Sequence, residues 1–172
     1  YKRQIMDTNN KILNQGEEGE VCIRGENVTS GYENNPDANK NSFSDGWFRT
    51  GDQGYFDKDG YLKISGRLKE IINKGGEKIS PLEVDNILMD HPNIEQAVCF
   101  GYEDKMLGED IASAIIIKEG MQCTEDDIKI YANEKLAKFK IPKKIFFVNE
   151  IPKGATGKLQ RNTLAKKFGL VN

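Results

Sequence analysis

The stretch of sequence that most constrains the fold runs from Ile111 to Lys118 and is almost continuously apolar. A short apolar run of this kind is typical of a strand in the middle of a sheet. The segments around it show the spacings of apolar residues that indicate further strands and helices. From residue 67 onward the predicted order is strand, helix, strand, strand, helix, strand, helix. Roughly 105 residues in that order are enough for one small α+β domain.

Two helix starts carry clear local signals. Ser80 is followed by Pro81 and, three positions after the serine, by Glu83. Proline suits the first position of a helix, and the serine and the glutamate together are typical of a capping box. Thr124 and Asp127 have the same spacing at the start of a second predicted helix. A closing helix is predicted over 159–168.

The strands are indicated by alternation and by turn residues. A hairpin is predicted over 47–65, because residues 57–60, Asp-Lys-Asp-Gly, have the composition of a turn between two apolar segments. The first forty-odd residues contain one clear short strand and no core of their own. The remaining predicted strands cover these ranges: 20–24, 67–72, 94–102 and 144–149.

Charge is unevenly distributed along the chain. Residues 135–172 contain ten basic residues and one acidic residue, a net charge of +9, and residues 1–134 have a net charge of −11. Such an asymmetry raises nucleic acid, a membrane surface or a phosphorylated ligand as a partner of the basic part. A non-enzymatic module that binds anions or nucleic acid is therefore one hypothesis. The aromatic residues of the tail argue against it, since they fit core positions: Phe139, Phe146, Phe147 and Phe168.

Several other classes of protein are excluded by composition. No apolar run approaches the ~20 residues that a bilayer requires, so we predict no membrane partner. The single histidine, His91, stands beside Pro92 at a predicted helix end, and we assign it neither a metal nor a catalytic role. Three widely spaced cysteines indicate reduced thiols and a cytoplasmic location: Cys22, Cys99 and Cys123. A peroxisomal location stays open, although residues 170–172 are not a peroxisomal signal.

Two segments carry weak signals of ligand binding. The two oxygens of Asp52 match a vicinal diol such as a ribose, but from spacing alone a turn-forming aspartate is the better explanation. Residues 153–158, Lys-Gly-Ala-Thr-Gly-Lys, fail the Walker pattern, because Pro152 stands where that pattern needs a glycine. What remains is a glycine loop that presents one lysine to an anion.

Four longer segments, taken together, are more specific than either signal. They follow one another in this order: 19–32, 48–60, 66–84 and 152–159. They resemble the later motifs of adenylate-forming enzymes, which include acyl- and aryl-CoA synthetases, luciferases and the adenylation domains of peptide synthetases. Within that superfamily, residues 51–56 and 75–81 are similar to oxalate–CoA ligases first and to 4-coumarate–CoA ligases next. The resemblance covers essentially the whole chain.

The resemblance extends only to the carboxyl-terminal part of that family. It implies that residues 1–66 are the last β segment of the large domain. Residues 67–172 would then be the small mobile α+β domain, a mainly antiparallel sheet flanked by helices. The phosphate-binding loop of the family and most of its acid pocket lie upstream of the matching region. We therefore expect residues 1–172 to need the missing amino-terminal domain in cis and to be inactive alone.

The activity that the resemblance implies is that of an ATP-dependent acid–CoA ligase. Such an enzyme activates a small carboxylic acid, here possibly oxalate, as acyl-AMP and transfers the acyl group to coenzyme A. ATP, coenzyme A and Mg²⁺ would be its cofactors, with the magnesium ligands in the missing amino-terminal part. An adenylation domain that loads a carrier protein is the alternative within the same superfamily.

Three residues would serve the first step by this resemblance. Asp52 would hold both ribose hydroxyls of the nucleotide. Arg67 would donate hydrogen bonds to the ribose or phosphate region. Lys158 would bridge the attacking carboxylate and the α-phosphate, where negative charge accumulates.

The second step would use another part of the chain. Lys69 occupies the hinge position of the family, where backbone rotation exchanges the Lys158 loop for a glycine loop. That glycine loop would let the pantetheine arm lie against its backbone, and its candidate residues are Gly75, Gly76 and Lys78. Some relatives carry lysine at the position of Asn73 and glutamine at that of Lys78, so the loop departs from their pattern.

Overall fold

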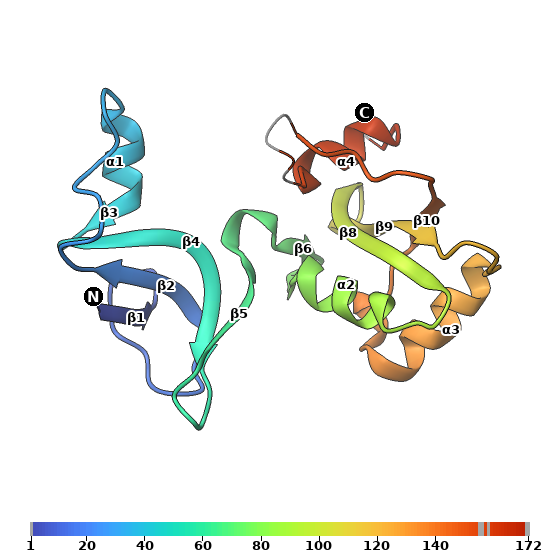
Figure 1. Ribbon diagram of the computed structural model, residues 1–172, viewed down its shortest axis with the longest axis horizontal. Helices are drawn as coiled ribbons and strands as arrows, with labels where there is room; N and C mark the ends of the chain where they lie inside the picture. Colours follow the sequence, from blue (N-terminus) through green and yellow to red (C-terminus); the bar gives the residue numbers. More distant parts are fainter. Residues whose placement is uncertain (1, 155–156, 158, 171–172) are drawn as a thin grey trace. The chain divides into compact units, whose positions relative to one another are not determined.

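The chain folds into two compact units in a computed structural model that describes residues 2–154, 157 and 159–170. The first unit is Tyr1–Lys69 and the second is Glu70–Asn172. Figure 1 shows that the first is built mainly from strands, whereas the second combines a sheet with helices. Within the described residues, no helix combines the length and the apolar character that crossing a membrane requires.

The first unit is a five-stranded antiparallel sheet in the order β1-β2-β4-β3, with β5 paired to β4. A small buried cluster of Met6, Cys22 and Trp47 packs within this unit. The strand predicted over 20–24 is confirmed. The elements are β1 (Lys2–Met6), β2 (Gly19–Arg24), α1 (Pro36–Ser42), β3 (Phe43–Ser44), β4 (Trp47–Phe56) and β5 (Leu62–Arg67).

The hairpin predicted over 47–65 is confirmed as β4 and β5. The carboxylate of Asp57 accepts hydrogen bonds from the backbone N–H of Asp59 at 3.1 Å and of Tyr61 at 2.9 Å. Gly60 has a φ of +81°, which glycine adopts without a steric penalty. The hydrogen bond from Tyr61 is the largest of the contributions that lower the pKa of Asp57.

The short helix α1 was not predicted from the sequence. Its N-cap is Asn35, whose side chain accepts a hydrogen bond from the Ala38 backbone N–H at 3.1 Å, and Pro36 stands at the first turn. Both are ordinary signals of a helix start. They are hard to recognise in a segment rich in Asn and Gly, where the same residues also indicate turns.

The second unit is a five-stranded sheet in the order β10-β9-β6-β7, with β8 also paired to β9. Among the described strands of this sheet, the pairing of β10 with β9 is parallel and the others are antiparallel. The predicted fold class, α+β with a mainly antiparallel sheet flanked by helices, is confirmed. The strands are β6 (Ile72–Lys74), β7 (Glu77–Ile79), β8 (Ile94–Asp104), β9 (Gly108–Ile117) and β10 (Lys144–Phe147); the helices are α2 (Pro81–Met89), α3 (Glu125–Lys135) and α4 (Arg161–Lys167), with a short 3-10 turn η2 (Lys138–Lys140). Another 3-10 turn, η1 (Leu68–Glu70), spans the division between the two units.

Strand β9 is the predicted central strand, and it is buried on both faces. Ile111 and Ile115 belong to a cluster that includes residues of α2 and α3. Ala112 and Ala114 belong to a second cluster, which includes Leu164 of α4. Successive side chains of a strand point to opposite faces, so helices on both sides of the sheet require an apolar run instead of an alternating one. Figure 1 shows α4 on one side of this sheet and α2 and α3 on the other.

The strand predicted over 67–72 is wrong. The segment is split, because Arg67 pairs with Asp52 in the sheet of the first unit and Ile72 pairs with Ile79 in the sheet of the second. The 3-10 turn η1 joins the two strands. Residues with similar local preferences thus belong to different sheets, which a local pattern does not reveal.

One of the two predicted capping boxes forms. At α3, the Thr124 side chain accepts from the Asp127 backbone N–H at 3.2 Å, and the Asp127 carboxylate accepts from the Thr124 N–H at 2.9 Å. At α2, the Ser80 side chain makes no capping hydrogen bond. The Glu83 carboxylate instead binds the Lys140 ammonium at 2.7 Å. The predicted box at α2 is therefore wrong.

The α3 cap leads to a stability prediction. We expect Thr124→Ala to lower the free energy of unfolding of the second unit by ~1 kcal/mol, because the Asp127 N–H loses its acceptor. Thr124→Ser keeps the hydroxyl and should cost less than about half of that. Urea denaturation, followed through the amide cross-peaks of β9, measures both values. Equal losses in the two variants would contradict the capping role.

Candidate functional site

The two residues expected to contact the nucleotide lie side by side in the first unit. Asp52 on β4 is the register partner of Arg67 on β5. The Arg67 Nε atom lies 3.1 Å from Oδ1 of Asp52, and the side chains are 54% and 31% exposed. The pair therefore presents one cation and one carboxylate, in contact with each other, at the surface of the sheet.

A buried glutamate sets the backbone that precedes Asp52. Glu20, on the neighbouring strand β2, accepts a hydrogen bond from the Gly51 N–H at 2.9 Å and forms an ion pair with Arg49 at 2.6 Å. Gly51 has a φ of +74°. The hydroxyl of Thr50 donates to the Val21 carbonyl and accepts from the Asp52 N–H. Glu20 was not among the predicted site residues, although an acidic residue within an apolar strand could have indicated it.

The predicted glycine loop is the turn of the β6–β7 hairpin. Gly75 and Gly76 have φ values of +60° and +96°, as the two central residues of a tight hairpin turn require. The Gly76 N–H donates to the Asn73 side chain at 3.1 Å, and the Gly75 N–H donates to the Leu107 carbonyl at 2.8 Å. Lys78 is exposed on β7 opposite Asn73. The loop is thus exposed, with a backbone that hydrogen bonds hold in place.

Two acidic residues of β9 bind β6 and hold this hairpin in place. Glu109 accepts from the Asn73 N–H at 2.6 Å, and the buried Asp110 forms an ion pair with Lys74 at 2.6 Å. Burial by itself raises the pKa of Asp110. The hydrogen bonds from Lys74, from the Ile111 N–H and from Lys143 outweigh it, and the net pKa lies below its ordinary value. Asp110 is therefore held as a carboxylate.

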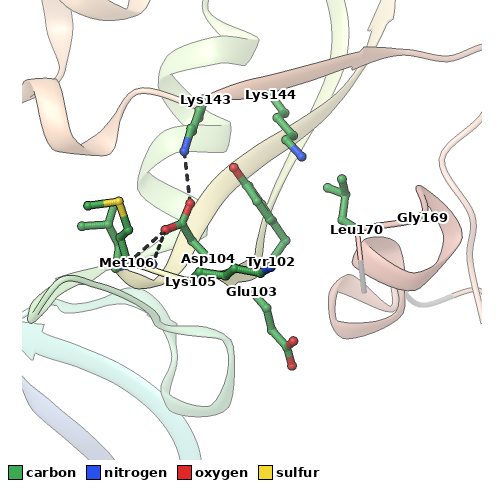
Figure 2. Close-up of a pocket in the computed structure, with 10 residues that line it drawn as sticks. Tyr102, Glu103, Asp104, Lys105, Met106, Lys143, Lys144, Gly169 and Leu170 are labelled. Carbon is green, nitrogen blue, oxygen red and sulfur yellow. Dashed lines mark hydrogen bonds and ion pairs between the residues drawn. The ribbon is translucent and has the colours of Figure 1, made fainter. Parts of the chain in front are cut away.

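A pocket of about 550 Å³ lies in the second unit (Figure 2). Lys143 forms ion pairs with Asp104 at 3.1 Å and with Asp110 at 3.2 Å. The Lys144 ammonium lies 4.7 Å from the centre of the Tyr102 ring. The pocket joins the glycine loop through Leu107, and its lining consists of Tyr102, Glu103, Asp104, Lys105, Met106, Leu107, Lys143, Lys144, Gly169 and Leu170.

The glycine-rich tail loop is closed at its base. Lys153 and Leu159 form an isolated antiparallel bridge, and the Gly157 N–H donates to the Gly154 carbonyl at 2.9 Å. Lys158, the residue expected to act on the α-phosphate, lies outside the described residues. Its assignment stays a prediction.

Directly after this loop, Arg161 forms an ion network that the sequence analysis did not find. Its guanidinium lies 3.0 Å from the Glu70 carboxylate and 2.8 Å from the Asp85 carboxylate. It also donates to the Cys99 carbonyl at 2.5 Å. Burial raises the pKa of Asp85 to about 6, although the positive charge of Arg161 opposes that shift. An acidic residue on the apolar face of the helix at α2 was the available signal.

Lys69, the predicted hinge, is the last residue of the first unit and lies in η1. The division between the units falls directly after it. The expectation that residues 1–66 and 67–172 belong to different domains of a larger enzyme, and that Lys69 is a hinge, remains a prediction.

His91 and the buried cysteines lie in surroundings that indicate structural roles. The His91 ring packs edge-on against Tyr131, and its Nδ1 accepts from the Asn93 N–H at 3.2 Å. Burial raises the pKa of Cys22 to about 11 and places that of Cys99 well above its ordinary value, which disfavours reactive thiolates. Within the described part of the chain, no three His, Cys, Asp or Glu side chains gather as a metal site.

The prediction that the tail aromatics occupy core positions is wrong for two of them. Phe146 and Phe168 stack on each other in the second cluster, with ring centres 4.5 Å apart. Phe139 and Phe147 are 37% and 46% exposed. The two exposed rings lie on η2 and on β10, the strand at one end of the sheet path.

Comparison with known proteins identifies relatives of this chain. The family described as AMP-binding enzyme C-terminal domain matches residues 83–158. The chain is 54% identical over 167 residues to an oxalate–CoA ligase of Arabidopsis thaliana and 52% identical over 166 residues to one of Saccharomyces cerevisiae. These alignments cover 97% and 95% of the chain. They cover 31% of each relative, so the chain spans about a third of their length.

Solved structures agree with that relationship. ATP-bound MatB of Rhodopseudomonas palustris superposes with a TM-score of 0.91 at 31% identity, over 97% of this chain and 34% of that one. An o-succinylbenzoate coenzyme A synthetase of Bacillus subtilis, in complex with ATP and magnesium ion, gives 0.85 at 36% identity, over 95% of this chain and 33% of that one. The resemblance inferred from the sequence is confirmed.

The raised pKa of Asp85 leads to a prediction about pH. A carboxyl group whose pKa is higher in the folded state stabilises the fold below its unfolded value of about 4, and this contribution is lost as the pH rises through about 6. The difference between these two pKa values corresponds to roughly 2–3 kcal/mol of unfolding free energy. The difference in unfolding free energy between the wild type and Asp85→Asn should therefore fall by that amount from pH 4 to pH 7.

Urea denaturation at each pH measures this difference, and an Asp127→Asn variant provides the control. The pKa of Asp127 is lowered, chiefly by the hydrogen bond from the Thr124 side chain. Its contribution to stability is therefore present above its ordinary pKa and is lost as the pH falls, so Asp127→Asn should show the opposite sign. A difference between wild type and Asp85→Asn that is constant from pH 4 to pH 7 would contradict the shift at Asp85.

Proposed function

The chain belongs to the adenylate-forming, AMP-binding enzymes as their carboxyl-terminal part, and on that premise we propose that it serves an ATP-dependent acid–CoA ligase. Such a ligase converts a carboxylate and ATP into acyl-AMP and pyrophosphate, and then forms the thioester with coenzyme A. Two of the relatives, at 54% and 52% identity, are named as oxalate–CoA ligases. The proposal concerns the complete protein in which this chain acts.

The observation that carries the proposal is the pairing of Asp52 with Arg67. The carboxylate can accept hydrogen bonds from the two ribose hydroxyls through its two oxygens, each of which has more than one acceptor position. The ion pair at 3.1 Å orients that carboxylate before a nucleotide arrives. The guanidinium supplies donors for the ribose or the phosphates. The hydrogen bond from the Gly51 N–H to Glu20 and the positive φ of Gly51 set the backbone that precedes Asp52.

In the adenylation step, Lys158 neutralises charge between two anions. The acid carboxylate and the α-phosphate repel each other, and a lysine between them lowers that repulsion and stabilises the charge of the in-line transfer. A lysine presented from a glycine loop can reach both groups as a compact point charge. The magnesium ion would be held by the upstream part of the enzyme, and we assign it no ligand in this chain.

In the thioester step, the backbone at Gly75 and Gly76 offers a surface without side chains, against which a narrow pantetheine arm fits. The adjoining pocket contains Lys143 and Lys144, whose charge suits the phosphates of coenzyme A. Lys143 is held by Asp104 and Asp110, which leaves Lys144 as the better candidate for a phosphate. Lys78 lies on the same hairpin as the glycines.

The proposal also includes a rotation at Lys69, between a large domain that ends with residues 1–66 and a small domain of residues 67–172. The division into two units directly after Lys69 is compatible with it. The rotation would exchange the Lys158 loop for the glycine loop in the active site. The three free cysteines, two of which are buried, favour the cytoplasm as the location of the protein.

The acid is proposed to be oxalate on the strength of the two relatives named for it. Over nearly the same stretch, a sulfoacetate–CoA ligase of Cupriavidus necator is 38% identical. Because relatives named for different acids share this stretch, the acid must be tested with the complete protein. Pyrophosphate release with oxalate, coumarate and fatty acids as substrates distinguishes the candidates.

The role of Lys158 leads to a prediction for the two half-reactions. In the complete enzyme, Lys158→Ala should lower ATP–pyrophosphate exchange by roughly 10²–10³-fold, because the charge that bridges the two anions is lost. Thioester formation from supplied acyl-adenylate should be largely spared. Lys153→Ala removes a lysine from the same loop and should leave both rates within about threefold. Equal losses in both half-reactions of Lys158→Ala would contradict the assigned role.

The pocket lysine leads to the reverse prediction. Lys144→Ala should raise the KM for coenzyme A about three- to tenfold, as expected for the loss of one exposed phosphate contact, with adenylation unchanged. Lys167→Ala, which removes an exposed lysine from α4 outside the pocket lining, is the matched control. Steady-state kinetics with varied coenzyme A measures the effect. If both variants show the same KM, the pocket does not bind the phosphates.

A further inference from the structure

Arg161 joins three elements of the second unit through one buried guanidinium. Its side chain is 10% exposed. Nε lies 3.0 Å from Glu70 of η1, and Nη1 lies 2.8 Å from Asp85 of α2. Nη1 also donates to the carbonyl of Cys99 on β8 at 2.5 Å. A planar guanidinium can serve several acceptors at once in fixed directions, which a lysine ammonium does not.

The carboxylates that bind Arg161 are themselves largely buried, and Asp85 has a further hydrogen-bond donor. The second oxygen of Asp85 accepts a hydrogen bond from the Cys99 backbone N–H at 2.5 Å. The Asp85 side chain is 5% exposed, and that of Glu70 is 21% exposed. Carboxylates at these depths are retained where a cation and hydrogen-bond donors compensate their charge. Arg161 supplies that compensation to both of them.

Arg161 lies directly after the tail loop in the sequence, so the network also holds the base of that loop. It follows Lys158 by three residues and Leu159 by two. Leu159 pairs with Lys153 at the base of the tail loop and packs against the cluster beneath α4. The downstream end of the loop that carries Lys158 is thus tied to the buried guanidinium by two residues of chain.

The other end of the network lies beside the proposed hinge. Glu70 is the first residue of the second unit and directly follows Lys69. A backbone rotation at Lys69 moves Glu70 with the second unit, and the bond from Glu70 to Arg161 spans 91 positions of the sequence. The ion pair therefore ties the residue directly after the hinge to the base of the tail loop, together with the contacts of Arg161 to Asp85 and Cys99, so that the two move as one body.

We propose that Arg161 and Glu70 are positioning residues, which couple rotation at Lys69 to the placement of the Lys158 loop. This inference rests on the proposed function and adds to it the means by which the loop is aligned. Misplacement of a reacting group by about 1 Å costs on the order of 10²-fold in rate. The coupling serves adenylation alone, because the glycine loop has its own anchors in Glu109 and Asp110.

The decisive variant in the complete enzyme is Glu70→Gln. Glutamine keeps the size and one acceptor but loses the charge, while Asp85 and Cys99 continue to hold Arg161, so the domain should fold. ATP–pyrophosphate exchange should fall roughly tenfold, a fraction of the ~10²-fold cost of full misplacement. Thioester formation from supplied acyl-adenylate should stay within about twofold. Arg161→Lys loses the planar guanidinium that binds several acceptors at once. It should lower ATP–pyrophosphate exchange further, again with thioester formation largely spared.

The matched control is Glu83→Gln, the same chemical change in the same unit. Glu83 binds Lys140 at 2.7 Å and has no contact with Arg161 among the described hydrogen bonds and ion pairs. Both half-reactions of this variant should stay within about twofold of the wild type. Hydrogen exchange by mass spectrometry adds a readout that is independent of activity. Residues 159–164 should exchange faster in Glu70→Gln than in Glu83→Gln.

The outcomes separate the inference from the function on which it rests. A wild-type enzyme without pyrophosphate exchange for any acid overturns the proposed function, and the coupling with it. If the wild type is active but Glu70→Gln loses both half-reactions equally, or matches Glu83→Gln in exchange and activity, the coupling alone is overturned. A selective loss of adenylation together with faster hydrogen exchange at 159–164 supports it.

Discussion

The burial of β9 on both faces is the constraint on which the second unit depends. Ile111 and Ile115 share a cluster with residues of α2 and α3, and Ala112 and Ala114 share one with Leu164 of α4, while the backbone of β9 pairs with β6, β8 and β10. A strand with water on one face would allow polar residues at every second position. Here both helical layers must stay in place for the strand to be covered. The glycine hairpin and the tail loop adjoin this sheet and its helices, so their positions follow from the packing around β9.

Buried or half-buried carboxylates hold the backbone beside each of the proposed sites. Glu20 binds the backbone before Asp52, Glu109 binds the backbone of the glycine hairpin, and Glu70 and Asp85 share Arg161 behind the tail loop. In each case a charged group receives hydrogen bonds in a site of reduced exposure, where such bonds are stronger than in water and costly to break. The exposed residues that meet ligands are thereby separated from the residues that keep the backbone fixed.

Much of the fold could be predicted where the signal is local. The Thr124 cap, the turn from Asp57 to Gly60 and the apolar run of β9 each depend on neighbouring residues, and each forms as expected. The capping box predicted at Ser80 does not form, and the Glu83 carboxylate binds Lys140, 57 positions away, instead. The strand predicted over 67–72 is divided, because its two ends pair in different sheets. Local preference fails at both places where a distant partner decides the outcome.

The sequence by itself determined the family, the α+β class and the residues to be considered for nucleotide and thiol binding, because short motifs and periodic apolar positions are local properties of the chain. Only the tertiary structure decided which of these residues meet. It paired Asp52 with Arg67 across two strands, and it brought Arg161 to Glu70 and Asp85 from 91 and 76 positions away. The physical reason is that a buried ion is stable only beside a partner of opposite charge, and chain reversals, which no local pattern specifies, select that partner.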